Sequence, residues 1–508
     1  MAVNQRKAGT ILSYVYIFVS NTISLFYTPI FLGMLGQAEY GLIGTANSLT
    51  SYLSLLSMGI GGSYIRFNAI ARTKGDKKEE HRVNGMFQII FTVISGLTLL
   101  VGTILVICSS SIFAENYTAA ELIEIRWIMI CLILQFVVTF MFNTTAMALN
   151  AYEKFVFIRV CLLISSCVQP IVNIIALYFG GNAVTISIIS LLTSFITYMG
   201  YFLFAKKTIG LKFSFDNFDK SLFKSIFVFS GFLFLNSLTD QITFSTDSII
   251  LGVISGPIAV AVYTVGANFK TYFISFSTAI SSVFSPQINR IVANKEDNGK
   301  LNDIFIRVGR VQFYVVTLIL TGYIFLGRQF ITLWVGNEYS ESYIIGLFLI
   351  LAVTVPSFQN VGLEIQKAKN LHKARSIVYF IIALANVGLT IPFARMWQGK
   401  GAAFATLICM FIGTVVFMNI YNQRKVGIDI IGFWKNIIRI LLGLIIPFGL
   451  GIIIKLFVPI NSYGKLLLYV LLYSCTFLAS VWFISMNKYE KNLLSSPIKK
   501  LLKKFKKQ

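Results

Sequence analysis

The stretch SIFVFSGFLFLNSLTDQITFSTDSIILGV (225–253) is long and apolar enough to cross a membrane, yet it carries two carboxylates, Asp240 and Asp247. A helix of about 20 apolar residues spans the hydrocarbon core, and an acid near its centre costs several kcal/mol unless it faces protein or water. The two acids are seven residues apart, so they share one helix face, about two turns from each other. We expect this face to line an aqueous pathway.

The composition of the whole chain agrees with a membrane protein. Of its 508 residues, 56% are hydrophobic and 12% are charged, whereas a soluble domain has roughly 25% charged residues. The six cysteines fall in apolar runs and the two histidines in charged loops. This pattern predicts neither a disulfide framework nor a metal site.

Fourteen apolar runs follow one another along the chain. An even number of crossings would place both termini on the same side of the membrane. The predicted spans are 10–35, 38–65, 84–108, 123–149, 160–179, 185–205, 225–253, 258–288, 304–326, 344–366, 376–395, 402–421, 437–458 and 465–485.

Positive charges indicate the orientation. With the N-terminus in the cytoplasm, the inside segments hold 36 of the 43 Lys and Arg residues, the outside segments hold six, and Lys270 belongs to neither side. Cytoplasmic loops carry such an excess, so we expect a multi-pass protein of the bacterial cytoplasmic membrane with both termini inside. Topology and contact with anionic lipid then explain the net charge of +23. No inside loop is long enough for a nucleic-acid-binding domain.

The C-terminal tail is strongly basic. In SSPIKKLLKKFKKQ (495–508), apolar residues recur at helical spacing opposite lysines. This pattern predicts an amphipathic helix at the membrane surface. A disordered basic tail that only anchors the topology is the alternative.

The two halves of the chain resemble each other. FNTTAMALNAYEKFVFIR (142–159) and FQNVGLEIQKAKNLHKAR (358–375) both end on Arg at an offset of 216, and Gly210 recurs as Gly427. Several weak matches in the same order favour a duplicated six-helix unit. Leu32–Gly33 recurs as Leu251–Gly252 at an offset of 219, and by that spacing Asp240 corresponds to Asn21, and Asp247 to Thr28.

The duplication predicts an all-α polytopic fold. Two six-helix lobes would be parallel repeats around a central cavity, which is the layout of an alternating-access transporter. The predicted parts are an N-terminal lobe 1–210, a C-terminal lobe 211–428, two extra helices in 429–485, and the basic cytoplasmic tail 486–508.

Two stretches also resemble a known family. FLGMLGQAEYGLIGTANSLTSYLSLLSMGIGGSYIRF (31–67) and DSIILGVISGPIAVAVYTVG (247–266) are similar to bacterial polysaccharide and O-antigen flippases of the multidrug/oligosaccharidyl-lipid/polysaccharide exporter superfamily. The resemblance implies a MATE-like fold and a lipid-linked oligosaccharide as substrate. A polysaccharide polymerase and glycosyltransferases would act beside it.

Three intramembrane charges are candidates for the transport chemistry. Asp240 and Lys270 should lie at similar depth on adjacent helices, where they could simply neutralise each other. Alternatively, Lys270 attracts a phosphate or acidic sugar and Asp240 releases it on binding H+ or Na+. Asp247 is either a second ion-responsive carboxylate or simply hydrated.

Other polar residues are candidates for substrate contact. Arg66 could meet a pyrophosphate at the inner leaflet, because guanidinium binds phosphate in a bidentate fork, or it could be a topology anchor. Four asparagines could bind sugar hydroxyls or make ordinary interhelical contacts. They are Asn21, Asn47, Asn236 and Asn268.

The sequence argues against an enzyme. It has no GxxxxGK[ST] phosphate loop, and its longest outside segments, 109–122 and 327–343, offer few charged residues for catalysis. We expect a flippase that needs no cofactor, with Na+ or H+ as the candidate coupling ion. The alternatives are a peptidoglycan-precursor flippase, an ion-coupled multidrug antiporter, and a membrane scaffold that does not transport.

Overall fold

A computed structural model describes residues 5–57, 60–73, 75–215, 220–294, 296–369, 371–493 and 495. Its elements are all helical within these ranges, and eleven of the described helices are long and apolar enough to cross a membrane. By internal contacts the chain forms two compact units. The first comprises Met1–Thr264 with Val387–Ala402, and the second comprises Val265–Asn386 with Ala403–Gln508.

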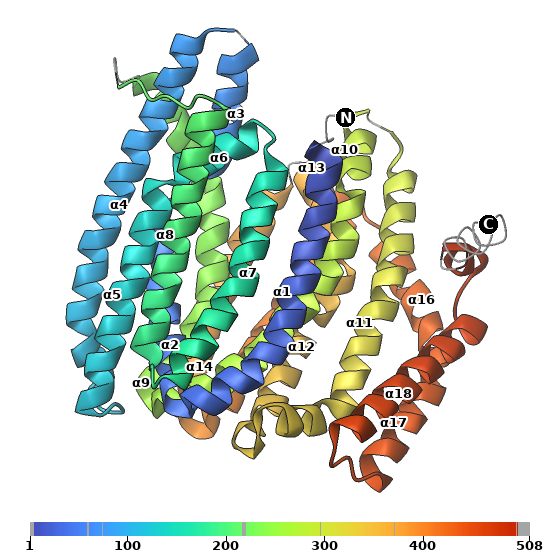
Figure 1. Cartoon of the computed structure of the whole chain (residues 1–508). Coiled ribbons are helices and arrows are strands. Elements are labelled where there is room, and N and C mark those ends of the chain that lie inside the picture. The colour runs from blue at the N-terminus through green and yellow to red at the C-terminus, as the bar shows by residue number, and fades with distance from the viewer. Residues whose placement is uncertain are drawn as a thin grey trace, which may run out of the picture. The chain divides into compact units, whose positions relative to one another are not determined.

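The first unit is built around long helices that pack side by side: α4 and α5 run antiparallel, whereas α5 and α8, and α1 and α7, run parallel. Helix α4 packs on α5, α5 on α8, and α1 on α7 (Figure 1). Aromatic and aliphatic side chains such as Leu42, Phe87 and Phe113 are fully buried between them. The elements are α1 (Gln5–Leu35), α2 (Gln37–Thr50), η1 (Ser51–Ser57), α3 (Ile60–Thr73), α4 (Lys77–Phe113), α5 (Ala119–Met141), α6 (Asn143–Ala151), α7 (Phe155–Tyr178) and α8 (Ala183–Thr208).

The second unit is organised around α11, which contacts α12, α17 and α18 (Figure 1). Helices α9 (Lys220–Ser281) and α14 (His372–Met410) contribute residues to both units. The remaining helices are α10 (Ser285–Ala293), α11 (Asn298–Val335), α12 (Ser342–Phe358), α13 (Asn360–Ala368), α15 (Met418–Tyr421), α16 (Ile430–Leu441), α17 (Ile445–Phe457) and α18 (Tyr463–Ile484). Short 3-10 or π segments are η2 (Ser282–Phe284), η3 (Asn337–Tyr339), η4 (Phe411–Phe417), η5 (Asn422–Val426) and η6 (Leu442–Leu444).

The predicted span 38–65 contains a 3-10 segment among its described residues. Between α2 and α3 the backbone tightens into the 3-10 segment η1. At its start the hydroxyls of Thr50 and Ser51 donate to the carbonyl oxygens of Ala46 and Ser48, at 2.7 and 2.8 Å. Such side-chain bonds compete with the regular helical ladder, and 3-10 stretches within a helix often mark functional hinges.

Two of the eleven long helices contain a sharp turn. In α9 the turn is at Gly256 (φ 79°, ψ −176°), and in α14 it is at Trp397 and Gln398. Both lie where the sequence predicts loops between adjacent spans. The count of fourteen crossings stays a prediction, because eleven helices meet the criteria of length and hydropathy.

Backbone features recur at an offset of 217, within one residue of the offset between the matching segments 142–159 and 358–375. Helices α6 and α13 each contain nine residues and begin after similar caps, Phe142 (φ −98°, ψ 4°) and Gln359 (φ −102°, ψ 11°). Gly210 and Gly427 both have positive φ, 61° and 78°. These similarities agree with a duplicated unit, while the lobe boundaries at 210 and 428 stay a prediction.

A buried ion pair fixes the start of the C-terminal tail to α11. The guanidinium of Arg310 donates to both carboxylate oxygens of Glu490, through Nε at 2.5 Å and Nη2 at 3.0 Å. The hydroxyl of Tyr314 and the backbone N–H of Asn487 also donate to Glu490, at 3.1 and 2.9 Å. Arg310 is thus an internal anchor rather than only a topology signal. The amphipathic part of the tail lies outside the described residues.

Candidate intramembrane polar site

Asp247 lies inside the first unit, where the two legs of α9 face each other. It is nine residues before Gly256, and Tyr263 is seven residues after it, so the sharp turn brings the two side chains to similar depth. Tyr263 Oη donates to Asp247 Oδ2 at 2.6 Å, and Thr390 Oγ1 of α14 donates to Oδ1 at 3.1 Å. All three side chains are buried, and Asp247 is 1% exposed.

Polar contacts also join η1 to the part of α9 that directly precedes Asp247. We call this group the polar seam and define it as Ser51, Tyr52, Gln241, Ser245 and Thr246. Tyr52 and Thr246 share a hydrogen bond of 2.5 Å between their hydroxyls. Gln241 Nε2 donates to Ser245 Oγ at 2.7 Å and also to Ser51 Oγ. The 3-10 segment η1 therefore contacts the helix that carries the buried acid through polar groups.

Neutral hydroxyls are suitable partners for a carboxyl group that changes its charge. A hydroxyl can donate to an ionised carboxylate and can also accept from a protonated one. Hydroxyl and carboxylate oxygens are also the ligands that hard cations prefer. Within the described part of the chain, no three or more His, Cys, Asp or Glu side chains cluster in a way that could hold a metal ion.

The structure places Asp247 away from bulk solvent, because the second leg of α9 and α14 cover it. Both alternatives for this acid, an ion-responsive carboxylate or a hydrated one, stay predictions. Asp240, two turns earlier on the same helix, is exposed, and its role in ion coupling stays a prediction. Lys270 is buried at 6% exposed and belongs to the second unit, so its pairing with Asp240 also stays a prediction.

The predicted substrate-binding residues are distributed over several elements. Arg66 is exposed on α3, with its guanidinium 6.0 Å from the ring centroid of Phe67. Asn47 is exposed on α2, whereas Asn21 on α1 and Asn268 in the second unit are half-buried. The side chain of Asn236 lies outside the described part of the chain. Whether these residues share one cavity stays a prediction.

Sequence reasoning missed the partners of Asp247. Tyr263 and Thr390 lie in runs that read as ordinary apolar spans, and a buried hydroxyl has no sequence signature of its own. One signal was present in the Gly256–Pro257 pair, since Gly followed by Pro marks a turn. Counting similar distances on either side of that turn would have placed Tyr263 opposite Asp247.

Comparisons with known proteins agree with this architecture. Residues 30–345 match the profile of the family described as "Polysaccharide biosynthesis protein". A relative from Bacillus subtilis (strain 168), "Uncharacterized membrane protein EpsK", is 22% identical over 466 residues, which cover 88% of each chain.

Solved structures share the fold at low sequence identity. "Lipid II flippase MurJ, inward closed conformation" aligns with a TM-score of 0.72 and 16% identity over 92% of this chain and 98% of that one. An inward-facing multidrug resistance MATE transporter of the MOP superfamily aligns with a TM-score of 0.67 and 14% identity over 82% and 99%. These proteins are a flippase and a transporter, not enzymes. The chain therefore belongs to the polysaccharide biosynthesis protein family and shares its fold with the lipid II flippase and the MATE transporter.

Proposed function

We propose that the protein is a flippase for a polyprenyl-(pyro)phosphate-linked oligosaccharide. It would move the headgroup from the inner to the outer leaflet of the bacterial cytoplasmic membrane by alternating access of two lobes, while the lipid tail stays in the bilayer. Surface polysaccharide synthesis would use the product, with a polymerase and glycosyltransferases as partners. The distribution of Lys and Arg supports cytoplasmic termini.

The observation that carries the proposal is the buried carboxylate of Asp247 in an apolar helix of a polysaccharide biosynthesis protein. Ionisable groups at membrane depth are costly and mark ion or substrate pathways. A transporter can use such a group because gain or loss of one cation changes the free energy of one conformation relative to the other. A scaffold would gain nothing from keeping it.

Asp247 is our first candidate for the coupling group, with H+ or Na+ as the ion. Its two hydroxyl partners can bond to either protonation state of the carboxyl group, and their oxygens could also ligate Na+. Asp240 is the second candidate. The membrane potential could add to the driving force, at about 2.3 kcal/mol per charge per 100 mV, if the substrate crosses as an anion.

Coupling can be tested in proteoliposomes that contain a fluorescent polyprenyl-diphosphate oligosaccharide. We expect a sodium or proton gradient to accelerate translocation by the wild type, and Asp247→Asn to abolish that acceleration. Asp240→Asn tests the second candidate in the same assay, and Asp303→Asn is the control, because it removes an exposed acid of α11 that is not assigned to transport. A full gradient response in the Asp247→Asn protein would remove this residue from coupling.

Substrate handling can be tested in cells. Arg66 and Lys270 are proposed to bind the anionic headgroup, with the four asparagines contacting sugars. We expect Arg66→Ala and Lys270→Ala to reduce surface polysaccharide at normal protein levels. Lys300→Ala is the control, since that lysine is exposed and paired with Glu296. Unchanged polysaccharide in both test variants would contradict the role in binding the anion.

A second candidate function is translocation of a peptidoglycan lipid precursor, which the TM-score of 0.72 to the lipid II flippase favours. The two functions have different consequences in the cell. Depletion of a peptidoglycan-precursor flippase causes loss of the cell wall and lysis, whereas depletion of an oligosaccharide flippase removes the surface polysaccharide from viable cells. Depletion followed by measurement of both readouts separates them.

A further inference from the structure

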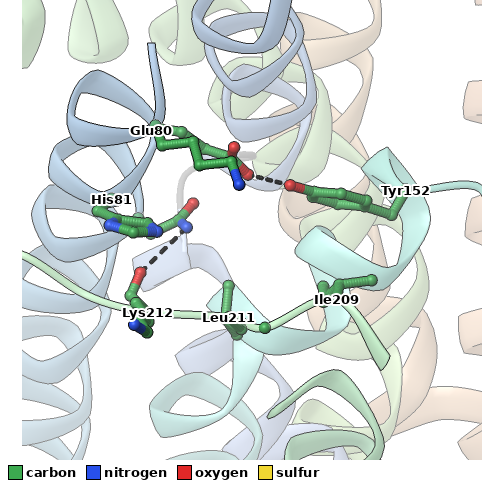
Figure 2. A pocket seen from close by; sticks show the side chains of 9 residues that line it. Glu80, His81, Tyr152, Ile209, Leu211 and Lys212 are labelled. Atoms are coloured by element: carbon green, nitrogen blue, oxygen red, sulfur yellow. Dashed lines mark hydrogen bonds between the residues drawn. The ribbon is translucent and has the colours of Figure 1, made fainter. Parts of the chain in front are cut away.

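The first unit contains a cavity of about 300 Å³ that is separate from the Asp247 site (Figure 2). It is formed by the first turns of α4, the residue after α6 and the segment that follows α8. These parts lie in or next to basic segments that the sequence assigns to the inner side of the membrane. The lining residues are Lys77, Glu80, His81, Asn84, Tyr152, Ile209, Gly210, Leu211 and Lys212.

Hydrogen bonds hold the walls of this cavity in place. Asn84, which is 1% exposed, accepts a bond from Tyr64 Oη at 2.7 Å through Oδ1. Its Nδ2 donates to the backbone carbonyl of Lys212 at 3.2 Å. The backbone N–H of Ser214 donates to the carbonyl of His81 at 2.9 Å. The segment after α8 is therefore attached to α4 at two points.

The close approach of this segment depends on a glycine. A Cβ atom at Gly85 would lie 1.8 Å from the carbonyl oxygen of Ser214. Such a contact is impossible, so the backbones can meet here only because position 85 has no side chain. The cavity wall is thus part of the folded unit, not a loop that happens to lie near it.

Charges around the cavity have an uneven balance. Glu80 accepts a hydrogen bond from Tyr152 Oη, and in Figure 2 these two residues lie on the side opposite Leu211 and Lys212. The guanidinium of Arg72 lies 3.9 Å from the ring centroid of Tyr152. With Lys77 and Lys212 in the lining, cations outnumber the single lining carboxylate. An anion is therefore the better fit.

We propose that this cavity binds a phosphate ester that carries hydroxyl groups. The ammonium groups of Lys77 and Lys212 suit a phosphate, and the carboxylate of Glu80 can accept from a hydroxyl. Ile209 and Leu211 offer apolar surface to the carbon chain of such a ligand. A volume of about 300 Å³ is at the lower end of small-ligand pockets and suits a glycerol phosphate or a sugar phosphate.

Two sources could supply this chemistry. A glycerophospholipid at the inner leaflet would present its headgroup from the bilayer, and a soluble phosphate ester would enter from the cytoplasm. Either ligand would bridge α4 and the segment after α8, and so stabilise the inner end of the first unit. This inference does not depend on the proposed transport function, because none of the cavity residues is assigned to it.

The test compares two probes on the purified full chain. For the lipid, the protein is transferred into detergent from nanodiscs that contain phosphatidylglycerol and phosphatidylcholine, and native mass spectrometry counts the phosphatidylglycerol that remains bound. For the soluble ligand, calorimetry measures the binding of glycerol 3-phosphate. We expect Lys77→Gln/Lys212→Gln to weaken binding of the responding probe by about tenfold or more, because charge-assisted hydrogen bonds are removed. A response to the lipid alone identifies a headgroup site, and a response to glycerol 3-phosphate identifies a soluble ligand.

The matched control is Lys78→Gln/Lys207→Gln, which removes two nearby cations that do not line the cavity. It should bind as the wild type does. Equal binding by the test and control variants, or no binding of either probe by the wild type, would overturn the proposal. If the double variant does not fold, Lys212→Gln alone gives the readout. Glu80→Gln should reduce the preference for phosphatidylglycerol over phosphatidic acid, which lacks the glycerol hydroxyls.

Discussion

Replacing Glu490 by Ala should loosen the attachment of the C-terminal tail to α11. The Glu490 side chain is 3% exposed and accepts hydrogen bonds from two nitrogens of Arg310, from Tyr314 and from the backbone of Asn487. The variant leaves the guanidinium of Arg310 buried without its carboxylate. The carbonyl oxygens of Asn436 and Ser485 still accept from it, at 3.2 Å each, but they carry no full charge.

The expected loss is about 3–5 kcal/mol, the range measured when one partner of a buried ion pair is removed. Because a factor of ten corresponds to about 1.4 kcal/mol, local opening should become about 10²- to 4 × 10³-fold more frequent. Surface pairs provide the contrast. Arg307 and Asp303, also on α11, are 3.4 Å apart with both side chains exposed, and Asp303→Ala should cost less than about 1 kcal/mol.

Hydrogen exchange of the purified protein, read by mass spectrometry, measures this local stability. Amides in 487–493 and at the end of α18 should exchange faster in Glu490→Ala and nearly normally in Asp303→Ala. An apolar replacement of the whole group, Arg310→Met/Tyr314→Phe/Glu490→Leu, should recover much of the protection, since no buried charge remains. Equal exchange in Glu490→Ala and Asp303→Ala would refute the reasoning.

Three further predictions concern single side chains in the first unit. Gly41→Val should destabilise the folded protein by about 1–3 kcal/mol or more, because a Cβ at position 41 would lie 1.9 Å from the carbonyl oxygen of Pro257. The yield of folded protein and a thermal unfolding assay measure this loss. Gly33→Val is the control, because a Cβ at position 33 would meet no atom within 4 Å. Burial, the hydrogen bond to Glu80 and the negative charge of Glu80 raise the pKa of Tyr152 to about 12. The contribution of the protonated phenol to the free energy of unfolding should therefore be complete below about pH 10 and should decline as the pH rises towards 12. The absorbance difference at about 295 nm between wild type and Tyr152→Phe should show one phenol that ionises near that pKa, and ionisation near the ordinary Tyr pKa of about 10 would contradict this. Tyr263→Phe should raise the ion concentration for half-maximal gradient-driven transport by about tenfold, as expected for one lost hydrogen bond to a charged group, and an unchanged midpoint would count against its role.

Most of the membrane architecture could be predicted from residue order. Apolar runs of about 20 residues need no tertiary information, since each helix satisfies its own backbone groups. The matching segments 142–159 and 358–375 also identified positions where the backbone repeats, as the caps at Phe142 and Gln359 show. The break at η1 was not predicted, because hydropathy does not distinguish a tight 3-10 stretch from a regular helix.

For the candidate site, the sequence and the tertiary structure supplied different information. The sequence by itself established that Asp240 and Asp247 lie inside an apolar span, because composition and spacing are local properties. Only the tertiary structure decided which acid is buried: the turn at Gly256 folds Tyr263 back onto Asp247, and α14 brings Thr390 from more than a hundred residues away. Burial and hydrogen bonding depend on neighbours from distant parts of the chain, and a linear pattern does not contain them.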